Sequence, residues 1–144
     1  MGLDMFLNGR KFLYNTGDYK APIEDGFQIK EKTLELGYWR KEPDLHGYIV
    51  KTFADGVDDC TPISLTTKHM RKIIEAILAD KLPPTDGFFF GKSARSDAES
   101  EEERKWAAEF KEEAIEIFTK AIAWVEDESV LRGEIRSVEY RASW

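Results

Sequence analysis

The chain is poor in the residues that build disulfides and metal sites. It has one cysteine, Cys60, and two histidines, His46 and His69, among 144 residues. A single thiol excludes an intrachain disulfide, and this inventory excludes four-cysteine zinc sites and Cys/His zinc fingers. Long apolar runs are also missing, since no stretch approaches the about 20 residues that a membrane-spanning helix needs. We therefore expect no metal, no cofactor and no membrane partner.

Basic residues are outnumbered by acidic ones, which gives a formal net charge of −7. Sequence-independent nucleic-acid binding depends on cations that neutralise phosphates, so direct nucleic-acid binding is disfavoured. Residues 97–117 hold nine acidic and three basic residues and thus carry most of this charge. The pattern predicts either an ordinary solvated helix face or an acidic surface for a basic protein partner. The candidate surface residues are Glu102, Glu109, Glu113 and Glu116.

The length suits one domain over residues 1–144, and a chain of this size can bury enough surface to fold without covalent links. Asp4 and Asn8 interrupt the short apolar run at the beginning of the sequence, which is not typical of a secretion signal. We therefore expect a cytoplasmic protein.

Hydrophobic periodicity predicts an α+β fold with a small, mostly antiparallel sheet packed against three helices. The clearest helix follows Thr66 or Thr67, where apolar residues recur at spacings of three and four up to the Pro83-Pro84 stop. A second helix is expected from Pro43 to about Ala54, and a long one from near Ser100 to about Glu126, with Trp106 and Phe110 on its apolar face.

Several short extended segments complete this prediction. Asn8-Gly9 is a typical hairpin turn, so strands are expected on either side of it. Residues 15–32 are predicted to be a loop. Further strands are expected at 33–39, at 88–90 and at 134–140, the last with a bulge between Ile135 and Val138. Because of Pro62, residues 61–65 are expected to form an edge strand or a loop. Trp39 and Phe88 to Phe90 are expected to be buried against the helix of Met70 to Leu78.

One candidate ligand site lies where the predicted strand at 33–39 meets the following helix. Tyr38, Trp39, Arg40 and His46 would supply a cation, an imidazole and a stacking wall for a small anionic group such as phosphate or a nucleotide. The alternative is structural: Arg40 pairs with a nearby acid, such as Asp44 or Asp4, and His46 packs on Phe53. No nucleophile accompanies His46 in the sequence, so catalysis is disfavoured.

The segment that begins at Gly87 ends in Gly91-Lys92-Ser93, as a phosphate-binding loop does. That motif needs four residues between its glycines, and here there are three, all phenylalanine. We interpret the segment as a buried strand followed by a polar loop.

The order of several motifs resembles a family of small phage and prophage proteins. These motifs are Gly2-Leu3-Asp4-Met5-Phe6-Leu7, Tyr38-Trp39-Arg40-Lys41 and Gly87-Phe88-Phe89-Phe90-Gly91, so the resemblance covers residues 2–91. The stretch Glu42-Pro43-Asp44 departs from the pattern, which usually has an alanine and a polar amide there. The resemblance implies a viral origin and the cytoplasm of an infected or lysogenic bacterium. It implies no enzyme.

Three functions follow as expectations. The first is an acidic, non-enzymatic phage protein that acts by binding a host or phage macromolecule, most simply a protein. The second is a binding protein or enzyme for a small anionic ligand at Trp39, Arg40 and His46. The third is a structural component of the virion or of its assembly.

Overall fold

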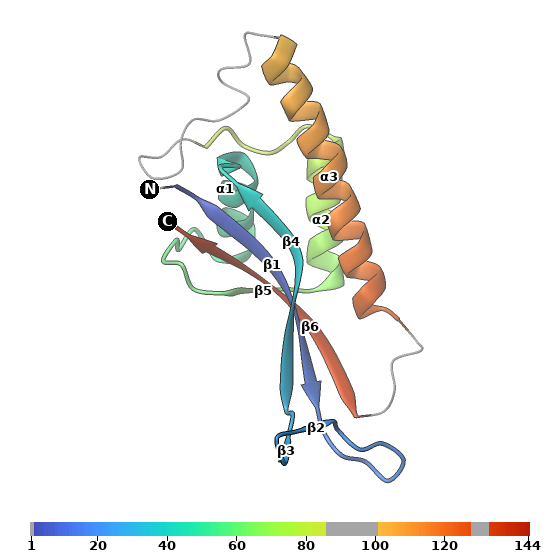
Figure 1. Cartoon of the computed structure of the whole chain (residues 1–144). Helices are drawn as coiled ribbons and strands as arrows, with labels where there is room; N and C mark the ends of the chain where they lie inside the picture. Colours follow the sequence, from blue (N-terminus) through green and yellow to red (C-terminus); the bar gives the residue numbers. More distant parts are fainter. Residues whose placement is uncertain (1, 86–100, 128–132) are drawn as a thin grey trace.

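A computed structural model describes residues 2–85, 101–127 and 133–144. It contains a four-stranded antiparallel sheet in the order β4-β1-β6-β5, three helices and a separate two-stranded hairpin (Figure 1). The predicted α+β class is confirmed. The sheet is built from β1 (Asp4–Leu13), β4 (Glu31–Arg40), β5 (Ile63–Leu65) and β6 (Glu134–Ser143), the hairpin from β2 (Ile23–Glu24) and β3 (Phe27–Gln28), and the helices are α1 (Pro43–Phe53), α2 (Thr67–Leu78) and α3 (Glu101–Val125).

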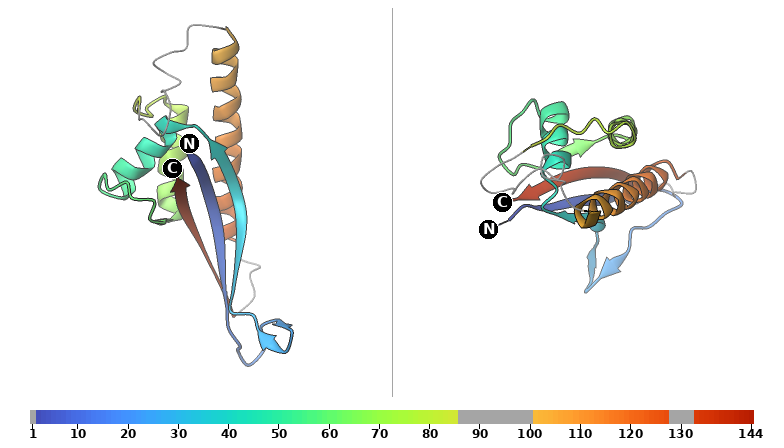
Figure 2. Two further views of the ribbon diagram at one scale, coloured as in Figure 1. Left: turned by 60° about the vertical axis from the view of Figure 1, so that its left-hand side comes forward. Right: turned by 90° about the horizontal axis from the view of Figure 1, so that it is seen from above.

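The hydrophobic core lies between the helices and one face of the sheet. Alternate residues of β1 point into it, and Met5 and Leu7 are fully buried. In the left view of Figure 2, β4 passes in front of α3, and α1 lies to the left of the strands. Each helix contributes a buried stripe, which contains Leu45 and Ile49 of α1, Met70, Ile73 and Ile77 of α2, and Ala114, Phe118, Ala121 and Ile122 of α3.

The opposite face of the sheet is polar and largely solvated, as is common in antiparallel sheets. Its side chains pair with one another across the strands. The rings of Phe6 and Tyr38 are in contact, with centroids 5.3 Å apart, and Arg10 forms ion pairs with Glu31 and Glu139. The lower halves of β1, β4 and β6 extend beyond the helices toward the β2–β3 hairpin (Figure 1).

The predicted hairpin turn at Asn8-Gly9 is wrong. β1 continues through both residues, and each pairs with a residue of β4 and of β6. The tight turn lies instead at Asp25-Gly26, inside the segment predicted to be a loop. Both of these residues have positive φ, 51° and 81°, as a two-residue hairpin connection requires.

The predicted bulge in the last strand is also misplaced. β6 pairs with β1 in unbroken register, and Ile135 is exposed on the face opposite to Val138. The irregularity lies in β4, because Leu7 pairs with Gly37 whereas Asn8 pairs with Glu35. Leu36 is therefore the extra residue, and a bulge at this place bends β4 along α3.

Two strand glycines allow α3 to pack closely on the sheet. A Cβ at Gly37 would lie 2.5 Å from Cγ2 of Ile117, and one at Gly9 would lie 2.8 Å from the Trp124 ring. Side chains at these positions would push the helix away. The glycine in Asn8-Gly9 therefore serves helix–sheet contact and not a turn.

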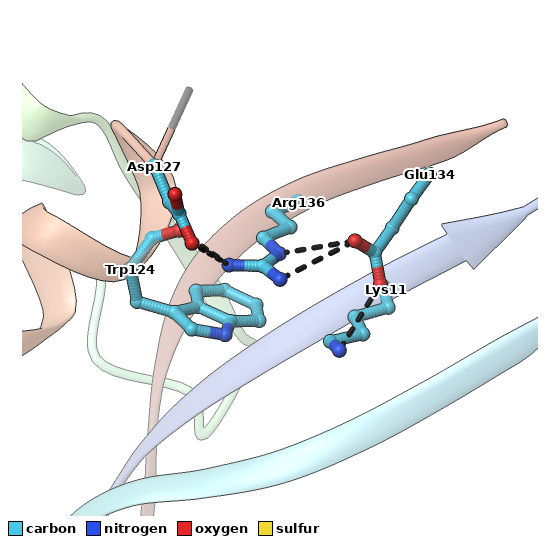
Figure 3. Close-up of polar contacts among 5 residues, drawn as sticks. All are labelled: Lys11, Trp124, Asp127, Glu134 and Arg136. Carbon is cyan, nitrogen blue, oxygen red and sulfur yellow. Dashed lines mark hydrogen bonds and ion pairs between the residues drawn. The ribbon is translucent and has the colours of Figure 1, made fainter. Parts of the chain in front are cut away.

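A charged cluster fixes the C-terminal end of α3 to the sheet (Figure 3). The Arg136 guanidinium lies over the Trp124 ring, 4.9 Å from its centroid, and donates to the Trp124 carbonyl at 2.9 Å. Glu134 accepts from Arg136 at 3.3 Å and pairs with Lys11 at 3.0 Å. A cation near the last carbonyls of a helix also stabilises the helix dipole.

The helices agree with the sequence pattern, but one packing partner does not. Thr66 caps α2, with His69 completing the reciprocal pair of hydrogen bonds. Trp39 is buried as expected, but its ring stacks on Phe118 of α3, with centroids 5.4 Å apart, whereas the sequence predicted packing against α2. The predicted strand at 88–90 lies outside the described residues.

Candidate functional site

A cleft of about 760 Å³ lies between the end of β4 and the N-terminal half of α3. The beginning of α1 and the C-terminal end of α2 close its other sides. Its residues are Tyr38, Trp39, Arg40, Lys41 and Glu42 with Asp44 of α1, Ile77, Asp80 and Leu82 in and after α2, and Glu103, Trp106, Ala107, Glu109, Phe110, Lys111 and Glu113 of α3. The cleft exists because all buried residues of α3 lie in its second half, from Ala114 onward.

The floor of the cleft is apolar and aromatic. Trp39, Ile77 and Leu82 are buried there, whereas Trp106 on α3 is 73% exposed. The buried indole N–H of Trp39 has no hydrogen-bond acceptor among the described residues. A buried donor without an acceptor is unfavourable by about 1–3 kcal/mol.

The rim of the cleft has more acidic than basic residues. Two of its cations, Lys111 and Arg40, lie near aspartates and not near the glutamates of the rim. Lys111 pairs with Asp80 at 3.1 Å, and Arg40 lies 3.9 Å from Asp4, outside the cleft. Within the described part of the chain, Glu109 and Glu113 form no salt bridge, and both are exposed. The cleft therefore presents carboxylates that form no salt bridge with any described residue.

Glu42 has a strongly shifted pKa. It is the residue before Pro43 at the beginning of α1, and its side chain makes no capping hydrogen bond. Burial, together with the negative charges of Asp44 and Glu113, raises its pKa from 4.5 to about 7. Near neutral pH this site therefore exchanges a proton.

Replacing Glu42 should make the folded chain more stable at high pH. The raised pKa means that the folded chain binds this proton more tightly than the unfolded chain. The stability that the protonated Glu42 contributes is therefore present below pH 4.5 and is lost as pH rises through about 7. Glu42→Gln should match the wild type near pH 4.5 and exceed it by on the order of 2–3 kcal/mol at pH 8. Urea unfolding across this pH range measures the difference, and a constant difference would contradict the raised pKa.

The structure separates the residues of the predicted anion site. Tyr38, Trp39 and Arg40 line the cleft, but His46 does not. The side chains of Tyr38 and Arg40 point to the solvated face of the sheet, where Tyr38 donates a hydrogen bond to Asp4 and Arg40 lies near the same carboxylate. The pairing of Arg40 with Asp4 is the structural alternative that the sequence left open.

His46 lies in the core and joins two distant segments. Its Nδ1 is 2.6 Å from the Tyr140 hydroxyl, and its Nε2 is 2.9 Å from Oδ2 of Asp58. A neutral ring satisfies both contacts when Tyr140 donates to Nδ1 and Nε2–H donates to Asp58. The other oxygen of Asp58 accepts from the Trp144 indole at 3.1 Å. The expected packing of His46 on Phe53 is not observed, since Phe53 contacts the rings of Tyr48 and His69.

The chain of carboxylate, imidazole and hydroxyl has the order found in nucleophilic hydrolases, but its hydroxyl is inaccessible. Tyr140 is 1% exposed, and burial raises the pKa of its hydroxyl. A nucleophile has to reach its substrate and release its proton. We therefore interpret Asp58, His46 and Tyr140 as a structural link between the loop after α1 and β6.

The predicted acidic surface is exposed at all four of its positions. The cleft divides them, because Glu109 and Glu113 lie on its rim while Glu102 and Glu116 do not. Glu116 instead pairs with Lys120 one helical turn away, at 2.9 Å. The structure thus joins half of the acidic surface to Tyr38, Trp39 and Arg40 in a single cleft.

Sequence reasoning missed Glu42, Asp44 and Trp106 as members of the site. Glu42 was visible only as a departure from the pattern of the family that the sequence resembles, and Asp44 also as a possible partner of Arg40. Asp44 is buried and accepts a hydrogen bond from the Thr85 backbone N–H at 2.9 Å. Trp106 was predicted to lie on the apolar face of the long helix. The sequence does not show that the first half of this face packs on no described part of the sheet.

Among residues 2–85, 101–127 and 133–144, no group of three or more His, Cys, Asp or Glu side chains is placed to hold a metal ion. In the same part of the chain, no helix is both long and apolar enough to span a bilayer. A comparison with protein-family models, curated proteins and solved structures finds no match for this chain.

Proposed function

We propose that this protein acts, without catalysis, by binding a protein partner, and that the cleft takes a partner segment that carries lysine or arginine beside an apolar residue. The observation that carries this proposal is the combination of an apolar floor with carboxylates that no described cation neutralises. Glu109 and Glu113 lie on the rim, and Trp39, Phe110 and Leu82 lie beneath them. Complementary charge of this kind selects partners and speeds their association.

The dimensions and the aromatic content of the cleft support a peptide-like occupant. A volume of about 760 Å³ lies in the range of roughly 300–1,000 Å³ that is typical of ligand sites. Trp106, with 73% of its surface exposed, can cover an apolar side chain of the partner. Exposed tryptophans that become buried on binding are frequent energetic centres of interfaces.

The sequence resemblance supports a setting for this activity. The motifs within residues 2–91 resemble those of the small phage and prophage proteins. We therefore propose that the partner is a phage or host protein in the cytoplasm of an infected or lysogenic bacterium.

Selection of peptides from a random display library on the immobilised full-length protein tests the proposed ligand class. We expect enrichment of sequences in which lysine or arginine adjoins an aliphatic or aromatic residue. Tryptophan fluorescence then gives affinities, because Trp39 and Trp106 both line the cleft. Enrichment of acidic or uncharged sequences would contradict the proposal.

Two charge-matched double variants should separate the cleft from the rest of the acidic helix. Glu109→Lys with Glu113→Lys should weaken binding of a selected peptide on the order of 100-fold, because two rim carboxylates become repulsive. Glu102→Lys with Glu116→Lys produces the same net charge on the same helix, outside the cleft. It should change the affinity by less than about threefold, the remaining effect of long-range charge.

Both double variants should keep the fold, because all four positions are exposed, and circular dichroism checks this. An equal loss of affinity in the two variants would mean that general charge, and not the cleft, binds the peptide.

A further inference from the structure

We infer that Glu42 is the residue that determines specificity in the cleft, and that its carboxylate receives the ammonium or guanidinium group of one bound lysine or arginine side chain. This inference rests on the proposed function and specifies one contact between the protein and the bound segment. The proposed function requires a basic segment somewhere in the cleft. The further inference assigns the charged end of one side chain to one carboxylate.

The backbone holds Glu42 firmly at the junction of β4 and α1. The Lys41 N–H donates to the Leu3 carbonyl at 2.9 Å, and the Glu42 carbonyl accepts from the His46 N–H at 3.2 Å. Pro43 occupies the first helical position and fixes the backbone that follows. A carboxylate on such a rigid segment is suited to orient a ligand, because little conformational entropy is lost when the contact forms.

The charges around Glu42 favour an added cation. Asp44 and Glu113 both act on Glu42 as like charges. The charged groups that line the same cleft are Arg40 and Lys41 from β4 and the turn after it, Asp44 from α1, Asp80 from the end of α2, and Glu103, Glu109, Lys111 and Glu113 from α3.

None of the three cations among the described residues of the cleft is paired with Glu42. Arg40 is near Asp4, Lys111 pairs with Asp80, and the Lys41 stem lies beside Gly2, whose added Cβ would be 3.6 Å from Lys41 Cε. Among the described residues, Glu42 forms no salt bridge. A cation from outside the chain would therefore meet the carboxylate of Glu42, with that of Glu113 acting on it from α3.

The buried floor beside Glu42 also has an unmet polar group. Trp39 lies three residues before Glu42, is 4% exposed and lines the cleft, and its indole N–H lacks an acceptor in the described part of the chain. This N–H is a donor, so it suits a backbone carbonyl of the bound segment and not the ammonium or guanidinium group. The aromatic and aliphatic surface there suits the methylene stem of lysine or arginine, whose charged end then reaches the carboxylate. This end of the cleft thus offers both an apolar channel and a charge to neutralise.

Proton release is the consequence that can be measured. Glu42 has a pKa of about 7 in the unliganded protein, so it is largely protonated at pH 6 and largely ionised at pH 8. A bound lysine ammonium keeps its charge over this range and replaces that proton. Affinity should therefore increase on the order of tenfold from pH 6 to pH 8.

The probe is the acetylated, amidated peptide KLGKLGK, titrated calorimetrically into the full-length protein at pH 6, 7 and 8. Two buffers of different ionisation enthalpy at pH 7 measure the protons released. We expect release of about half a proton per bound peptide at pH 7, the fraction still held by Glu42 at its pKa. Acetylation of the three lysines should abolish binding.

Glu42→Gln provides the decisive comparison, because glutamine resembles the protonated carboxyl in shape. The variant should bind like the wild type at pH 6, should bind about tenfold more weakly at pH 8, and should release no proton. Glu102→Gln, outside the cleft, is the matched control and should retain both the pH dependence and the proton release.

The outcomes distinguish the two proposals. If the wild type does not bind the peptide at any of the three pH values, both proposals are overturned, because the cleft then takes no basic segment. If Glu42→Gln binds with the wild-type pH dependence and proton release, the inference about Glu42 is overturned while the proposed function stands.

Discussion

Phe118→Ala should lower the free energy of unfolding by about 3–5 kcal/mol, because it removes a large side chain that is completely buried. Phe118 is the centre of the contact between α3 and the sheet. Its ring stacks on Trp39 with centroids 5.4 Å apart and an angle of 20° between the planes. Truncation removes this contact and leaves a cavity that the close packing at Gly37 and Ile117 cannot readily fill.

Urea unfolding followed by circular dichroism measures this loss, and two variants serve as controls. Phe118→Leu keeps most of the volume and should lose less than half as much. Trp106→Ala removes an even larger aromatic from the same helix, but one that is 73% exposed, and should change stability by less than about 0.5 kcal/mol. Equal losses for Phe118→Ala and Trp106→Ala would contradict the assignment of the buried face of α3.

The sequence predicted correctly the helices, whose formation depends on residues that are close together in the chain. α2 has a capping residue at Thr66 and apolar residues on one face, and it begins where the sequence predicts. The prediction of a turn at Asn8-Gly9 was wrong because it used only these two residues. The pairing of β1 with strands on both sides outweighs their turn preference. The composition of that dipeptide cannot show that Trp124, over a hundred residues later, packs on Gly9.

The site was predictable only in parts for the same reason. Tyr38, Trp39 and Arg40 attracted notice as an aromatic and basic cluster, and Glu109 and Glu113 as members of an acidic helix. Their meeting in one cleft depends on how α3 crosses the end of β4, which the sequence does not encode locally. Glu42 became notable only when Asp44 and Glu113 were both placed near it.

His46 illustrates how one side chain can suggest function and yet serve structure. Its position a few residues after Arg40 pointed to a shared anion site, but the ring is 2% exposed and joins residues that are 12 and 94 positions away. A buried, hydrogen-bonded histidine of this kind contributes to stability through the groups that it satisfies.

His46→Ala should therefore destabilise the fold by about 3–4 kcal/mol and leave peptide binding in the cleft intact. The Tyr140 hydroxyl loses its partner in a fully buried place, which alone is unfavourable by about 1–3 kcal/mol, and a cavity adds to this. Asp58 is less affected, because it is one-quarter exposed and still accepts from Trp144. Tyr140→Phe should lose only about 1–2 kcal/mol.

The double variant with both changes should be more stable than the sum of the single losses implies, with a coupling of about 1–2 kcal/mol. Additive losses would show that the 2.6 Å contact between His46 and Tyr140 contributes little. The His46 imidazole resonances in the wild type give an independent check. They should not move when millimolar phosphate or nucleotide is added, because both ring nitrogens are engaged within the protein. A shift that saturates with added ligand, together with a matching shift at Arg40, would restore the anion site that these two residues suggested in the sequence.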